Sequence, residues 1–150
     1  MPRLSRGLFA TLAVAAVSMP AVLSGQTALP ADSLERARAA ARFFYAGEAD
    51  SLIVRMTPAT LAAVGGKAGL IEGISTVGLR AGEEVSVVEE RWNMRNGQRQ
   101  YWRTSKMSIF PADFLLRLNI DAAGNITGIG MGPADNAPPI ESQGPVIPRP

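Results

Sequence analysis

The spacing of apolar residues changes once along this chain, near residue 83. Before that point, apolar residues recur every three or four positions, as on the buried face of an α-helix. Beyond it, apolar and polar residues alternate with a period of two, which is typical of half-buried β-strands. The pattern therefore predicts an α+β fold, in which N-terminal helices pack on an antiparallel sheet.

The first predicted helix runs from about residue 33 to residue 46. Asp32 is a favourable N-cap, Glu35 stands three residues later as in a capping box, and Gly47 ends the helix. Helical spacing predicts one buried stripe, made of Leu34, Ala37, Ala41, Phe44 and Tyr45. We expect the arginines of this helix to face water, namely Arg36, Arg38 and Arg42.

Two shorter helices are expected after the first one. One covers about residues 49–56, and the other covers residues 58–64, with Thr57 as its cap and Pro58 in its first turn. Residues 67–77 contain apolar residues at helical spacing, but the glycines among them weaken a helix. Both a helix and an irregular turn remain open for that segment.

Four strands are predicted at about 84–95, 98–110, 114–121 and 126–131. Asn96-Gly97 separates the first two and predicts a tight hairpin, because both residues tolerate the positive φ of a type I′ turn. The last strand is rich in glycine, which indicates that something packs closely across it. We expect these strands to form a curved, cone-like sheet.

Residues 1–25 have the order of a secretory signal peptide. Arg3 and Arg6 precede a short apolar stretch, and small residues follow near Ser24. The alternative, a membrane anchor, is disfavoured because residues 8–23 are shorter than the ~20 apolar residues that a bilayer needs. With no cysteine, export to a bacterial periplasm or medium fits best. Membrane contact is then expected only through the leader before cleavage.

Charge excludes one class of partner once the leader is removed. The chain has 15 Lys and Arg against 13 Asp and Glu, so losing Arg3 and Arg6 leaves 13 of each sign. A net charge near zero does not favour a nucleic-acid partner. The absence of cysteine and histidine removes thiolate metal sites and histidine bases, so we expect no cofactor and no metal.

The domain boundaries follow from these patterns. Residues 31–133 form the predicted α+β cone domain, and residues 134–150 form a proline-rich tail. Prolines at 138, 139, 145 and 148 interrupt any regular ladder, so the tail is expected to be extended or disordered.

The order of elements resembles a known superfamily. A capped helix with an aromatic end (ARFFYAGEAD) precedes strands that close with LRLNIDAAGNITGIGM. This resembles the nuclear-transport-factor-2-like superfamily, and within it a bacterial exported family of unknown function that is sometimes fused to hydrolases. The resemblance covers about residues 32–133 and implies a cone of antiparallel strands around the first helix. Its motifs are structural, so no catalytic residue is carried over.

The hairpin register places candidate ligand-binding residues together. With Arg95 facing Gln98, Trp92 lies opposite Tyr101, and Glu90 lies opposite Arg103 on the same face. These four residues and Tyr45 are the predicted walls of a pocket. The simpler interpretation, which we favour, is a cross-strand ion pair between Glu90 and Arg103 near the open mouth of the cone, and a bulge near residues 87–88 could also turn Glu90 outward. On the other face, Arg91 is expected to stack on Trp102.

Two functional hypotheses follow. The first is a non-catalytic exported module that binds a small-molecule or peptide ligand, or that forms a homodimer through sheet faces carrying Leu115 and Trp102. The alternative is a small isomerase- or hydrolase-like enzyme that uses a carboxylate and a tyrosine in the cone. A deep cavity containing Glu90 would favour the enzyme.

Overall fold

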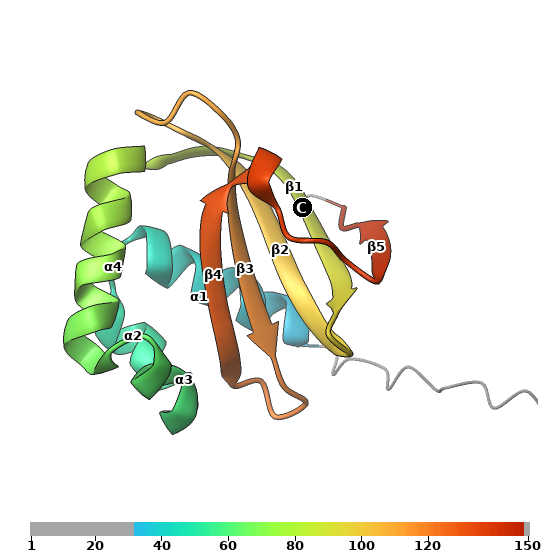
Figure 1. Ribbon diagram of the computed structural model, residues 1–150, viewed down its shortest axis with the longest axis horizontal. Coiled ribbons are helices and arrows are strands. Elements are labelled where there is room, and N and C mark those ends of the chain that lie inside the picture. Colours follow the sequence, from blue (N-terminus) through green and yellow to red (C-terminus); the bar gives the residue numbers. More distant parts are fainter. Residues whose placement is uncertain (1–31, 149–150) are drawn as a thin grey trace, which may run out of the picture.

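The computed structural model describes residues 32–148, and the predicted leader lies outside them. Four helices come first: α1 (Ser33–Tyr45), α2 (Ala49–Ile53), α3 (Pro58–Ala63) and α4 (Gly66–Ala81). The strands follow as β1 (Glu84–Arg95), β2 (Gln98–Met107), β3 (Phe114–Ile120), β4 (Ile126–Pro133) and β5 (Ser142–Val146), with a short 3₁₀ helix, η1 (Ala134–Asn136), between the last two. The α+β class and the order of helices before strands are confirmed (Figure 1).

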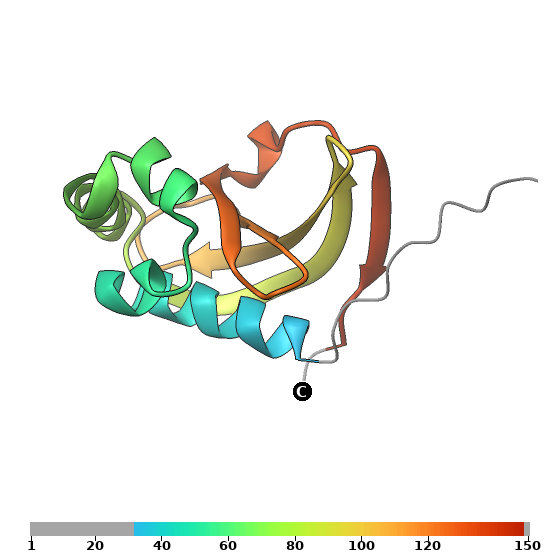
Figure 2. The same cartoon turned by 90° about the horizontal axis from the view of Figure 1, so that it is seen from below.

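The strands form one open antiparallel sheet in the order β4-β3-β2-β1-β5. It has five strands where the sequence predicted four, because the C-terminal segment adds one. Helix α1 lies along one face of this sheet, and η1 lies on the opposite side (Figure 2). We call the face toward α1 the helix face and the other the outer face.

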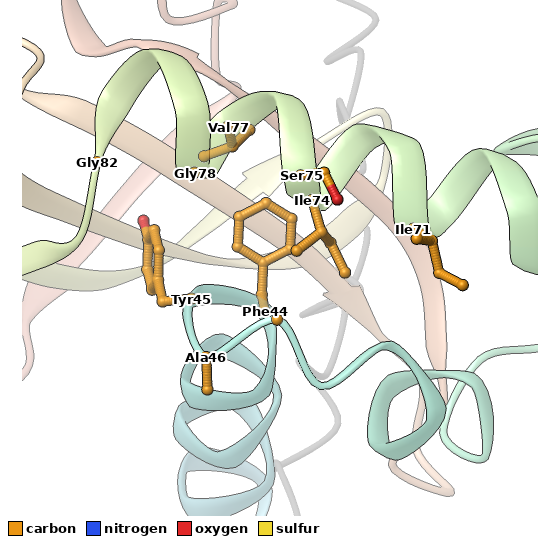
Figure 3. A pocket seen from close by; sticks show the side chains of 10 residues that line it. Phe44, Tyr45, Ala46, Ile71, Ile74, Ser75, Val77, Gly78 and Gly82 are labelled. Carbon is orange, nitrogen blue, oxygen red and sulfur yellow. The ribbon is translucent and has the colours of Figure 1, made fainter.

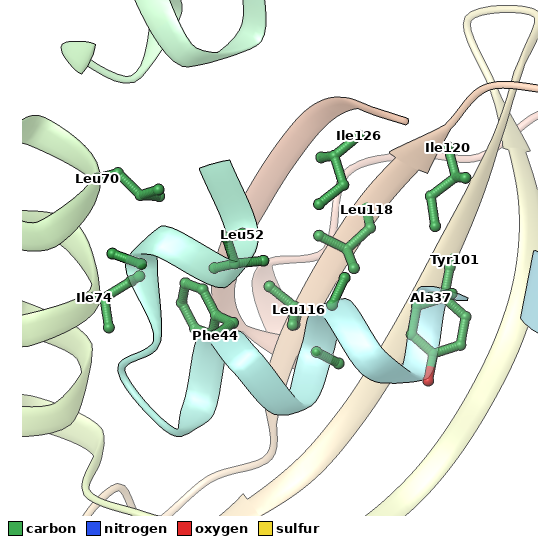
Figure 4. Packing of buried hydrophobic residues seen from close by; sticks show 13 residues of the cluster. Ala37, Phe44, Leu52, Leu70, Ile74, Tyr101, Leu116, Leu118, Ile120 and Ile126 are labelled. Carbon is green, nitrogen blue, oxygen red and sulfur yellow. The ribbon is translucent and has the colours of Figure 1, made fainter. Parts of the chain in front are cut away.

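Helix α1 packs through the predicted stripe. Ala37, Ala41 and Phe44 are buried as expected. Their small or flat side chains bring the helix close to Tyr101, Leu116 and Leu118, which are fully buried in the sheet (Figure 4).

The helix ends differ in how well they match the expected caps. Thr57 caps α3 as predicted, since its hydroxyl accepts a hydrogen bond from the Thr60 amide. Asp32 occupies the N-cap position of α1 but makes no side-chain cap; its carboxylate binds Arg36 instead. The chain leaves α1 through Gly47, whose φ is +77°.

Helix α4 settles the segment that the sequence left open. It is a continuous helix of 16 residues despite its glycines. Leu70 and Ile74 are buried against the core, and this packing outweighs the weak intrinsic helix propensity. Residue 69 has to be glycine for α4 to lie this close to the end of α3, because a Cβ there would lie 2.1 Å from the Val64 carbonyl oxygen.

The predicted hairpin register is confirmed. Arg95 pairs with Gln98, and the turn residues Asn96 and Gly97 have φ of +53° and +66°, as a type I′ turn requires. A bulge near residues 87–88, the alternative that would have turned Glu90 outward, is present between Val87 and Glu89, but it does not have that effect. It precedes Glu90, so the register beyond it is unchanged and Glu90 stays on the helix face.

The C-terminal segment is more ordered than predicted. Residues 142–146, expected to be extended or disordered, form β5 on the free edge of β1. Proline is tolerated there because an edge strand bonds to only one neighbour. Backbone amides at the two ends of the segment complete the attachment: Glu141 donates to the Met94 carbonyl and Ile147 to the Glu90 carbonyl, both at 2.8 Å.

Gly144 lets β5 approach β1 closely. Its amide donates to the Asn93 side chain at 3.2 Å, and its carbonyl accepts from Arg91 at 3.0 Å. A Cβ at this position would lie 1.9 Å from the Trp92 carbonyl oxygen, which is backbone and cannot move aside. The fit of the segment therefore depends on glycine at position 144.

We expect Gly144→Val to detach residues 141–148 from β1. Hydrogen exchange at the Glu141 and Ile147 amides should then rise toward that of an unfolded chain, because both lose their carbonyl partners. Gln143→Val is the matched control, since the side chain of Gln143 is exposed in the same strand. Equal exchange in the two variants would contradict the role assigned to Gly144.

Candidate functional site

Glu90 is the centre of a buried polar network between α1 and the sheet. Its side chain is only 4% exposed. One carboxylate oxygen accepts from the Tyr101 hydroxyl and from Arg103 Nη1, the latter at 2.9 Å. The other oxygen accepts from Arg38 Nε at 3.0 Å and Nη2 at 2.7 Å. Both oxygens are thus engaged by protein groups.

The network continues from Arg103 to a second carboxylate. Arg103 Nε and Nη2 donate to the two oxygens of Glu84 at 2.8 and 2.7 Å, which is the bidentate geometry of strong guanidinium pairs. Ser105 also donates to Glu84. Arg103 is therefore held between Glu84 and Glu90 along the helix face.

These contacts set the protonation states. Burial by itself would raise the pKa of Glu90, but hydrogen bonds from Arg38 and Tyr101 outweigh it and hold that pKa below its ordinary value of 4.5. Burial and the bond to Glu90 raise the pKa of Tyr101. Burial would lower the pKa of Arg103, but the pairing with Glu84 raises it. Glu90 is a stabilised anion at neutral pH.

Two members of the network were missed from the sequence. Arg38, expected to face water, is 13% exposed and bound to Glu90. Its spacing from Leu34, Ala41 and Tyr45 places it at the edge of the buried stripe, and this signal could have found it. Glu84 lies on the helix face, as Glu90 does, because residues six apart in a strand share a face. The two register shifts of β1, between Glu84 and Ser86 and between Val87 and Glu89, pair Glu84 with Met107, which is two residues closer to Arg103 than an unshifted register would allow. The alternation of β1 could therefore have found Glu84, whereas the shift that brings it near Arg103 had no signal in the sequence.

The five predicted ligand-binding residues fall into two places. Glu90, Tyr101 and Arg103 meet in the network, and Trp92 packs on Tyr101 with ring centroids 5.5 Å apart. Tyr45 lies at the end of α1 and lines a separate pocket. On the outer face, Arg117 and not Arg91 lies over Trp102, at 5.9 Å, because Arg91 is bound to Glu89.

The pocket at Tyr45 lies between the C-terminal end of α1 and one side of α4 (Figure 3). Its volume is about 220 Å³, and it is open to solvent on one side. Most of its walls are apolar or glycine. The lining residues are Phe44, Tyr45, Ala46, Gly47, Ile71, Ile74, Ser75, Val77, Gly78 and Gly82.

The Tyr45 hydroxyl is the unusual polar group of this pocket. It is buried and has no hydrogen-bond partner among residues 32–148. The Ser105 hydroxyl lies close enough to Tyr45 to lower its pKa through a hydrogen bond, but Ser105 donates its hydrogen to Glu84. Burial raises the pKa of Tyr45, and the nearby charge of Glu84 adds to the shift. A neutral phenol in an apolar wall is suited to one hydrogen bond with a bound molecule.

Residues 32–148 were also compared with the requirements of a metal site and of a membrane-spanning helix. No group of three or more Asp and Glu residues in this range is placed to hold a metal ion. None of its helices is long and apolar enough to cross a bilayer.

We expect Glu90→Gln to destabilise the protein by about 3 kcal/mol, because two buried guanidinium groups lose their shared negative charge. Equilibrium urea unfolding measures the change. Glu35→Gln is the control, since that carboxylate is exposed and sits 3.4 Å from Arg38, so its loss should change stability by less than about 0.5 kcal/mol. A similar loss in both variants would count against a central role for Glu90.

The stabilisation from Glu90 should depend on pH. Its pKa is lower in the folded than in the unfolded chain, so the unfolded state takes up the proton first as pH falls. The difference in unfolding free energy between wild type and Glu90→Gln should be complete above pH 4.5 and shrink as pH falls below that value. A difference that stays constant through this range would show that Glu90 is not a stabilised anion.

Comparison with known proteins does not place this chain in a family. No protein-family model matches it, and no curated protein or solved structure matches it significantly. The resemblance to the nuclear-transport-factor-2-like superfamily stays a prediction, and function has to be inferred from the residues themselves.

Proposed function

We propose that this protein is an exported, non-catalytic module that binds a small, largely apolar molecule in the pocket between α1 and α4. The observation that carries the proposal is the apolar pocket itself, which is open to solvent and has the ring of Tyr45 in its wall. The Tyr45 hydroxyl is buried beside this pocket and makes no hydrogen bond of its own. In this proposal a small turn of the ring brings the hydroxyl to a ligand oxygen, and the new hydrogen bond contributes about 1–3 kcal/mol.

The dimensions of the pocket favour a small molecule over a peptide. Its volume of about 220 Å³ lies below the roughly 300–1,000 Å³ of sites for drug-sized ligands. The apolar walls formed by Phe44, Ile74 and Val77 favour a compact hydrocarbon or aromatic body. The ligand class is therefore a small apolar alcohol, phenol or carbonyl compound.

The enzymatic alternative receives less support from the same residues. Glu90 and Tyr101 do form a carboxylate–tyrosine pair, but both oxygens of Glu90 are filled by protein donors. A general base or acid at neutral pH needs a raised carboxylate pKa, and that of Glu90 is lowered. The pocket at Tyr45 has no carboxylate among its lining residues. In this proposal, Glu90, Trp92, Tyr101 and Arg103 form a rigid frame.

The argument for a homodimer formed through the sheet is also weakened, because it depended on an exposed apolar sheet face. Leu115, expected to be exposed on the outer face, is only 3% exposed. It borders Ala134, Ala137 and Ile140 of the segment that follows β4. The homodimer stays a prediction without an observation in its favour.

The proposal is tested with two probes that differ only in a hydroxyl group, 2-naphthol and naphthalene. We expect 2-naphthol to bind about tenfold more tightly than naphthalene, because only 2-naphthol satisfies Tyr45. Tyr45→Phe should remove most of this difference. Ser75→Phe should weaken both probes at least about tenfold by filling the pocket. Equilibrium dialysis, or fluorescence of the bound probe, measures the affinities.

Leu79→Phe is the matched control for the filled pocket. Leu79 lies on the same helix, is 80% exposed and does not line the pocket, so this variant should bind as wild type does. Binding that survives Ser75→Phe, or that falls equally in Leu79→Phe, would place the probe elsewhere and overturn the proposal.

A further inference from the structure

A second, polar hollow lies on the outer face of the sheet, away from the pocket at Tyr45. Its volume is about 200 Å³. It spans the end of β1 near the hairpin and the adjacent parts of β2, β3 and β4. Its walls are formed by Arg95, Gln100, Arg117, Asn119, Gly128, Ile129 and Gly130.

The hollow contains two guanidinium groups that lack anionic partners. Within residues 32–148, neither Arg95 nor Arg117 makes an ion pair or a hydrogen bond through its side chain, and Arg95 Nε is fully buried. Three other arginines of low exposure behave differently, although the half-buried Arg55 and Arg99 also hold no carboxylate. Arg38, Arg91 and Arg103 each hold a carboxylate. Arg95 and Arg117 are distinguished by lining the same hollow without a carboxylate between them and by the buried, unpaired Nε of Arg95.

Glycines in β4 make room for this arrangement. Arg117 pairs with Gly130 across the strands, and a Cβ at Gly130 would lie 2.6 Å from Arg117 Nη2. Gly128 pairs with Asn119 in the same way, with a Cβ 3.0 Å from Asn119 Nδ2. The glycines of β4 indicated from the sequence that other groups pack closely across this strand. The side chains of Arg117 and Asn119 are those groups. Arg117 is thereby fixed between the backbone of β4 and the ring of Trp102.

The electrostatics of the hollow favour an anion. Burial lowers the pKa of Arg117, and the charge of Arg95 lowers it further. Arginine does not give up its proton at ordinary pH, so this unfavourable interaction persists until a negative charge arrives. An anion in the hollow would interact with both guanidinium groups at once.

The side-chain amide of Gln100 provides a neutral hydrogen-bond donor in the hollow that Arg95 and Arg117 line. Gln100 is 4% exposed, and its side-chain oxygen accepts from Trp102 Nε1 at 3.0 Å. This bond orients the amide and leaves its nitrogen without an acceptor among the described residues. Arginine forks combined with an amide donor match the oxygen atoms of carboxylate and phosphate groups.

We infer that the hollow formed by Arg95, Gln100 and Arg117 is a binding site for a small oxyanion, either a phosphate or a carboxylate group. It lies on the face opposite α1 and does not depend on the function proposed for the pocket at Tyr45. Both ligand types share the same chemistry, a compact anion with two or more oxygen acceptors. The shape of the anion decides between them.

Isothermal titration of the purified protein with inorganic phosphate and, separately, with acetate tests the site. Both titrations use constant ionic strength with chloride as the background anion, so that general screening cancels. We expect saturable binding of at least one of the two anions. Tighter binding of phosphate would identify a tetrahedral ligand group, and tighter binding of acetate would identify a planar one.

Arg95→Gln and Arg117→Gln should each weaken that binding by about tenfold or more, since each removes a charged donor. Arg99→Gln is the matched control. Arg99 follows the same hairpin turn and carries the same charge, but it pairs with Met94 and does not line the hollow. It should retain wild-type affinity to within about twofold.

Arg95→Gln also separates a ligand site from a structural role. Without added phosphate or acetate, this variant should unfold at the same urea concentration as wild type or a higher one, because repulsion with Arg117 is relieved. Absence of saturable binding for both anions would overturn the inference, as would an equal loss in Arg99→Gln. Unchanged anion binding in Ser75→Phe is expected, because the two sites are separate.

Discussion

The buried carboxylate of Glu90 is the interaction on which the arrangement of this protein depends. A charge removed from water is tolerated only when it is paired and hydrogen-bonded. The required partners come from α1 through Arg38 and from β2 through Tyr101 and Arg103. Because all of these groups must meet at one point, they fix the position of the helix on the sheet and the register of β1 with β2.

The same point anchors the C-terminal segment. The Ile147 amide donates to the backbone carbonyl of Glu90, and Arg38 reaches the Pro148 carbonyl at 3.2 Å. Strand β5 thereby covers the edge of β1, which would otherwise present unpaired backbone groups to other chains. The region predicted as a separate tail is part of the sheet, and its closing contacts use the residues that hold α1.

The buried polar groups of this protein differ in how completely their hydrogen bonds are satisfied. Beneath α1, every oxygen of Glu84 and Glu90 has a donor, so that region is suited to stability. Four buried polar atoms among the described residues make no hydrogen bond, namely Ser33 Oγ, Tyr45 Oη, Arg95 Nε and Asp113 Oδ1, and of these residues Tyr45 and Arg95 line a hollow. Binding energy is gained where a ligand supplies a missing partner, and this is why the proposed sites lie away from Glu90, Trp92, Tyr101 and Arg103, while Tyr45 alone of the residues first chosen stays in one of them.

The sequence by itself determined the features that local chemistry controls. The change of period gave the α+β order, and Asn96-Gly97 set a register that placed Trp92 beside Tyr101 and Glu90 beside Arg103. Tertiary structure decided the rest, since each remaining feature depends on a partner distant in the chain. Packing of Leu70 and Ile74 makes α4 helical despite its glycines, and the free edge of β1 orders β5. The Glu90 carboxylate draws Arg38 inward, and paired register shifts in β1 bring Glu84 within reach of Arg103, because a buried charge is stabilised by whichever opposite charge the fold brings close to it.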